Sequence, residues 1–95
     1  MANFFSRDEI GILVSALETY DEAKQTYIRA DLKHTLIHTS LHKLMTYSVL
    51  TNFTKQEYSV MYFALDHVAN SFVLSGYQPD DELLTLLSKI ETLAS

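Results

Sequence analysis

Hydrophobic and polar residues along this chain follow the period of an α-helix. In the N-terminal segment, apolar residues recur at steps of three and four, and polar residues fall on the opposite face of a helical wheel. The apolar positions there are Ile10, Leu13, Val14, Leu17, Tyr20, Tyr27 and Ile28. Similar patterns predict helices over residues 6–28, 31–50, 54–75 and 79–94.

Two of the predicted helix starts carry a capping box. Ser6 precedes Glu9 by three residues, as Thr54 precedes Glu57, so that in each pair either side chain can bond the backbone amide of the other residue. The segments FSRDEIGILVSALE and FTKQEYSVMYFALD, which contain these boxes, also match in residue type at most positions. A duplicated helical hairpin and the chance likeness of two capped amphipathic helices both account for this match.

The other helix ends have weaker signals. Gly76 suits the residue after a helix C-terminus, and Pro79 suits the first turn of the next helix, where the acidic residues 80–82 favour the helix dipole. No strong helix-breaking signal separates the first two helices, so the sequence leaves undecided whether a turn near residues 28–32 divides them. We expect a single all-α domain over residues 1–95, an antiparallel up-down four-helix bundle built from two helical hairpins.

Composition and charge narrow the classes of partner. The chain has 95 residues, 47% of them hydrophobic, and a net charge of −5. The acidic surplus lies in residues 56–95, where Lys89 is the sole basic residue apart from histidine. Because nucleic acid and anionic membranes require clustered Lys and Arg, we expect neither as a partner. The short apolar runs and the lack of cysteine lead us to expect a cytoplasmic protein.

Catalysis is not expected either. The chain has two glycines and no cysteine, which leaves no phosphate-binding glycine loop and no thiol nucleophile. Asp66 and His67 are adjacent, but consecutive helical residues point about 100° apart and do not face each other. We expect no enzyme activity and no cofactor. Capped, leucine-rich helices of this kind are common in small bacterial and phage accessory proteins.

Three histidines stand one helical turn apart in the second predicted helix. His34, His38 and His42 drift by about 40° per turn, so all three cannot bind one ion. We interpret them mainly as a half-buried polar border of the helix. A metal-binding bundle that uses His34 and His38, with Asp31 at a carboxylate-x-x-His spacing, is the alternative function. A pH-sensitive contact surface is a third interpretation.

The third predicted helix is apolar on more than one face. A helix apolar nearly all round must be covered nearly all round, either by the other helices of the bundle or by another protein. We hypothesise a non-catalytic protein-interaction module, an adaptor, regulator or antagonist of a larger protein, that forms a homodimer through this helix. The candidate contact residues are Phe63, His67, Asn70, Leu74, Val60 and Phe4.

A small-ligand binder is a weaker possibility. Its pocket would lie between the second and third helices, where several tyrosines cluster in the sequence. The lining residues would be Tyr47, Tyr58, Tyr62 and Met45.

Overall fold

Four helices make up the part of the chain that the computed structural model describes, residues 5–24, 32–48 and 50–95, with the side chains of residues 22–24 and 32–34 excepted. The helices are α1 (Arg7–Lys24), α2 (Leu32–Met45), α3 (Lys55–Leu74) and α4 (Asp81–Ala94). The described residues contain no strand. The prediction of an all-α four-helix bundle is confirmed. Whether a turn separates the first two helices near residues 28–32 depends on residues 25–31, which lie outside the described backbone.

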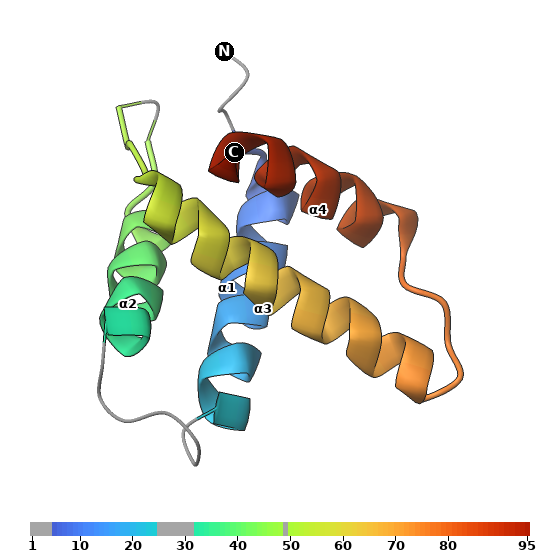
Figure 1. Ribbon diagram of the computed structural model, residues 1–95. Helices are drawn as coiled ribbons and strands as arrows, with labels where there is room; N and C mark the ends of the chain where they lie inside the picture. Colours follow the sequence, from blue (N-terminus) through green and yellow to red (C-terminus); the bar gives the residue numbers. More distant parts are fainter. Residues whose placement is uncertain (1–4, 25–31, 49) are drawn as a thin grey trace.

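The helices form two antiparallel hairpins (Figure 1). α1 and α2 lie side by side, and the hairpin of α3 and α4 crosses them obliquely, so that α3 contacts each of the other three helices. The core is drawn from all four helices and from Phe5, two residues before α1. Its fully buried large side chains are Phe5, Leu13, Leu17, Ile37, Leu44, Met61, Leu65, Leu86 and Ile90.

Two predicted boundaries differ from the observed ones. α2 ends at Met45, not near residue 50, and a loop follows in which the Thr46 hydroxyl donates to the His42 carbonyl at 2.9 Å. Tyr47 lies in this loop and not in the helix. The Tyr47 hydroxyl accepts a hydrogen bond from the Phe5 amide at 3.0 Å. α4 begins at Asp81 rather than Pro79, because the residue between them adopts the extended conformation of an N-cap.

Both predicted capping boxes are present. At the start of α1, the Ser6 amide donates to Glu9 Oε1 at 2.8 Å, and the Glu9 amide donates to Ser6 Oγ at 3.1 Å. At the start of α3, Thr54 and Glu57 repeat both bonds at the same two distances. Two helix starts are thus closed by the same local chemistry.

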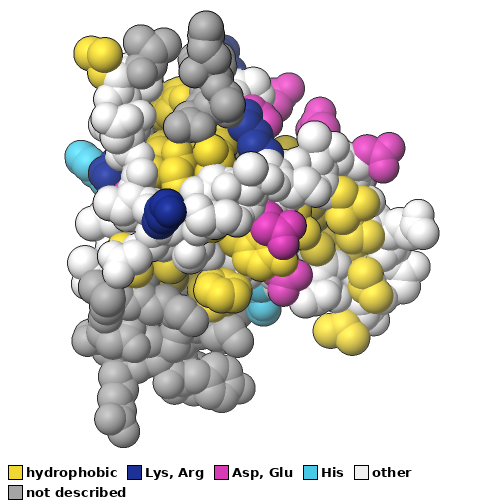
Figure 2. Space-filling model, turned by 45° about the horizontal axis from the view of Figure 1, so that its top comes forward, with side chains coloured by type: hydrophobic (Ala, Val, Ile, Leu, Met, Phe, Trp, Pro, Cys, Tyr) yellow, Lys and Arg dark blue, Asp and Glu magenta, His cyan; other side chains and the backbone are white. Residues whose placement is uncertain are grey.

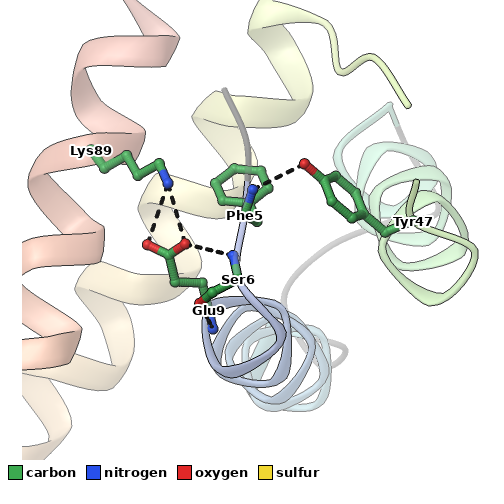
Figure 3. Close-up of polar contacts among 5 residues, drawn as sticks. All are labelled: Phe5, Ser6, Glu9, Tyr47 and Lys89. Carbon is green, nitrogen blue, oxygen red and sulfur yellow. Dashed lines mark hydrogen bonds and ion pairs between the residues drawn. The ribbon is translucent and has the colours of Figure 1, made fainter. Parts of the chain in front are cut away.

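Each capping glutamate is also held by a lysine from another helix. Lys89 Nζ of α4 lies 3.2 Å from Glu9 Oε1 and 4.9 Å from the centre of the Phe5 ring (Figure 3). Lys43 Nζ of α2 lies 2.7 Å from Glu57 Oε1 and 5.7 Å from the centre of a phenylalanine ring that likewise precedes its box. The two hairpins are therefore joined by two equivalent lysine–glutamate ion pairs.

Hydrogen bonding outweighs burial at both carboxylates. Burial raises the pKa of Glu57, but the ammonium of Lys43 and the Thr54 amide lower it by more than burial raises it. The pKa of Glu57 therefore lies below the ordinary value of 4.5. Burial likewise raises the pKa of Glu9, whereas the Ser6 amide and Lys89 bring it below 4.5. Both groups therefore stabilise the fold in their charged form.

Candidate protein-interaction surface

The outer face of α3 carries the candidate contact residues. Phe63 is 49% exposed and Leu74 is 88% exposed, and the exposed Asn70 lies between them, with its amide donating to the Asp66 carboxylate at 3.3 Å. His67 is half-buried and packs edge-on against Tyr20 at 5.6 Å between ring centres. These positions follow steps of three and four, so they share one face of the helix.

Val60 does not belong to this exposed face. The sequence placed it beside Phe63, but the side chain is 3% exposed and lies in the core of the subunit, because it falls on the flank of α3 that the bundle covers. Phe4, the other residue expected to extend the surface, lies outside the described residues. The exposed part of the surface therefore extends toward the C-terminal end of α3.

That end of α3 is closed by a Schellman motif. The Tyr77 amide donates to the Phe72 carbonyl at 2.9 Å, and the Gly76 amide donates to the Val73 carbonyl at 3.1 Å. Gly76 has a φ of 86°, the left-handed conformation that this motif requires of its glycine. The last helical turn is thus held in a defined shape, although it lies at the surface.

Hydrophobic side chains are exposed around this motif. Figure 2 shows them over the end of the molecule where α3 ends and α4 begins. We call this surface the apolar end, and it consists of Phe72, Val73, Leu74 and Tyr77 with exposed fractions of 40%, 60%, 88% and 69%. Residues 68–79 carry no charged side chain, so the apolar end lies in an uncharged segment.

A trough lies beside the apolar end and shares Phe72 and Tyr77 with it. It has a volume of about 780 Å³ and runs between α1, the last turns of α3 and the start of α4. A second hollow of about 450 Å³ adjoins it between the starts of α1 and α4 and shares Asp8, Ile12 and Glu82 with it. The walls of the trough include Gly11, Ile12, Ser15, Thr19, Val68, Ser71, Phe72, Tyr77 and Leu83.

The trough was missed by the sequence analysis. Gly11, Ser15 and Thr19 recur every fourth residue on the exposed side of α1, which is a readable stripe of small side chains. These small side chains line a trough only because α3 and the start of α4 face them, and the residue spacing within α1 does not predict that arrangement.

The histidines do not assemble into a recognisable metal centre in the described part of the chain. His38 Nε2 lies 3.8 Å from an Asp21 carboxylate oxygen, and His42 is exposed. No group of three or more His, Cys, Asp or Glu side chains is placed to hold a metal ion among the described residues. Asp31 and the His34 side chain lie outside the described residues. Of the three residues named for a metal site, the structure therefore describes the side chain of His38 alone.

The tyrosines expected to line a ligand pocket have different surroundings. Tyr58 is buried and lies 5.5 Å from Phe53 between ring centres, and Tyr47 stacks on the same Phe53 ring at 6.4 Å, so the three rings form one aromatic cluster. Met45 is 76% exposed at the end of α2. The aromatic cluster therefore closes the junction of α1, α2 and α3.

Comparison with known proteins finds no matching family model, curated protein or solved structure. Among the described helices, none combines the length and the apolar character needed to cross a bilayer.

Proposed function

We propose that this protein is a non-catalytic protein-interaction module that pairs with a second copy of itself through the apolar end of α3. The proposal is supported above all by Leu74, which is 88% exposed on a rigidly capped helix end, with Val73 60% exposed beside it. Contiguous exposed apolar side chains are typical of contact sites on soluble domains.

A second copy suits this surface because the surface is uncharged. In an isologous dimer the same patch meets itself, so any charge on it would face a like charge. Residues 68–79 contain no Asp, Glu, Lys or Arg, although the chain as a whole carries a net charge of −5. The apolar end can therefore meet its own copy without bringing like charges of residues 68–79 into contact.

Sedimentation equilibrium of the full chain tests the proposal. Burying a leucine contributes roughly 1.5–3 kcal/mol, and a symmetric dimer buries two copies of Leu74, so Leu74→Asp is expected to weaken self-association about a hundredfold or more. Leu50→Asp is the matched control, because Leu50 is 84% exposed in the loop before α3, away from the apolar end.

We expect a dimer for the unaltered chain and for Leu50→Asp, and a monomer with unchanged helical circular dichroism for Leu74→Asp. A monomeric unaltered chain at every concentration, or equal loss in both variants, would refute pairing through this surface.

A further inference from the structure

The trough beside α1 has the shape of a site for an elongated, largely apolar segment. It lies open to solvent along α1, and the adjoining hollow extends it toward the helix start. Positions 7–19 of α1 border it, a length of about 18 Å, or about three turns of helix. Its lining surface is mostly apolar, with Ile12, Phe72 and Leu83 among its walls.

Gly11 makes this side of α1 open. A glycine in the middle of a helix lowers helix stability relative to alanine, and it is usually kept where a backbone or ligand comes close. A Cβ atom built at Gly11 meets no atom of the described residues within 4 Å, so their packing does not require a glycine there. Ser15 and Thr19 continue the small and exposed side of α1 along the trough.

The rim of the trough is acidic. Asp8, Asp80, Asp81 and Glu82 are exposed around the trough and its adjoining hollow, and Arg7 is the one basic residue among the residues that line the two. None of these four carboxylates is ion-paired with a residue in the part of the chain that the structure describes. Helix dipoles favour acidic residues in each first turn, but they do not bring two helix starts to the same trough.

We propose that this trough binds an amphipathic helix of a partner protein, with apolar side chains on the face turned to α1 and α3 and Lys or Arg at its borders. The inference rests on the proposed function as an interaction module and adds the chemistry of a second partner. A second copy of this chain is disfavoured here, because a symmetric pair would place the four acidic side chains of one rim against those of the other.

The two proposed surfaces overlap at Phe72 and Tyr77, which belong to the apolar end and also wall the trough. Val73 and Leu74 belong to the apolar end alone, because they are not among the lining residues of the trough. A substitution at Leu74 therefore disturbs self-association without changing a wall of the trough.

The probe is a labelled synthetic peptide of about 14 residues with leucine along one helical face and lysine along its borders. A matched peptide carries glutamate in place of each lysine. Binding to the full chain is followed by fluorescence anisotropy at low and high salt. We expect the lysine peptide to bind at least tenfold more tightly than the glutamate peptide, and we expect added salt to weaken its binding.

Gly11→Gln and Gly11→Ala separate the trough from general charge attraction. Both substitutions favour helix formation and leave the charge of the chain unchanged, but the glutamine side chain projects from the wall into the trough. We expect at least tenfold weaker peptide binding for Gly11→Gln, binding within threefold of the unaltered chain for Gly11→Ala, and a urea midpoint no lower in either variant.

Equal binding of the two peptides, or undiminished binding to Gly11→Gln, would overturn the proposal. So would a dimer that Gly11→Gln dissociates, because the occupant of the trough would then be a second copy. Leu74→Asp should leave peptide binding intact, so a failed dimer at the apolar end and an unoccupied trough give different results.

Discussion

Replacing Glu57 by alanine tests how the start of α3 is held. The Glu57 side chain is 4% exposed, accepts the Thr54 amide at 2.8 Å, and pairs with Lys43 at 2.7 Å. Loss of a capping bond costs about 1 kcal/mol. Breaking an exposed ion pair costs up to about 1 kcal/mol, and breaking a buried one costs about 3–5 kcal/mol. Because Lys43 is 33% exposed, we expect the loss of this partly buried pair to cost about 1–2 kcal/mol.

Glu57→Ala should therefore lower the free energy of unfolding by about 2–3 kcal/mol, measured by urea denaturation. Glu57→Gln keeps an acceptor for the Thr54 amide and loses the ion pair, so it should cost about 1 kcal/mol less than alanine. Glu82→Ala is the control, because this exposed first-turn glutamate interacts mainly with the helix dipole, at roughly 0.3–1 kcal/mol. A Glu57→Ala variant no less stable than the control, or equal to Glu57→Gln, would contradict this reasoning.

Three further predictions concern stability. Gly76→Ala should lower the free energy of unfolding by about 1 kcal/mol in urea, because the φ of 86° strains any other residue, and an unchanged value would remove the role of the Schellman motif. Ser40→Ala should leave urea stability unchanged or higher, since the buried Ser40 hydroxyl has no hydrogen-bond partner among the described residues, and a loss above about 1 kcal/mol would reveal one. The pKa values of Glu9 and Glu57 are lowered by folding, so their stabilisation is complete above pH 4.5 and is lost as the pH falls below it. Urea curves from pH 6 to pH 3 should show that loss, and a Glu9→Gln/Glu57→Gln double variant should show a shallower one.

The parts of the fold that were predictable are those set by neighbours in the chain. Ser6 and Thr54 each stand three residues before a glutamate, and Gly76 follows a periodic apolar stretch, so local hydrogen bonding is enough to predict these ends. The end of α2 was misplaced because Tyr47 leaves the helix to reach the Phe5 amide, a contact between residues 42 positions apart.

The candidate surfaces were predictable only in part. Helical periodicity put Phe63 and Leu74 on one face, and both are exposed. It could not separate Val60 from them, because burial at the flank of α3 depends on which helix lies beside it. The lysines that hold the capping glutamates were also missed, since Lys89 of α4 and Glu9 of α1 meet only because both helices pack on α3.

An isotope-filtered NOE experiment on an equimolar mixture of labelled and unlabelled chains tests self-pairing most directly. The proposed symmetric contact predicts NOEs between subunits at the methyl groups of Val73 and Leu74, and their loss in Leu74→Asp. NOEs between subunits that involve only Leu50 or Met45, or no such NOEs under conditions where the chain sediments as a dimer, would contradict pairing through the apolar end.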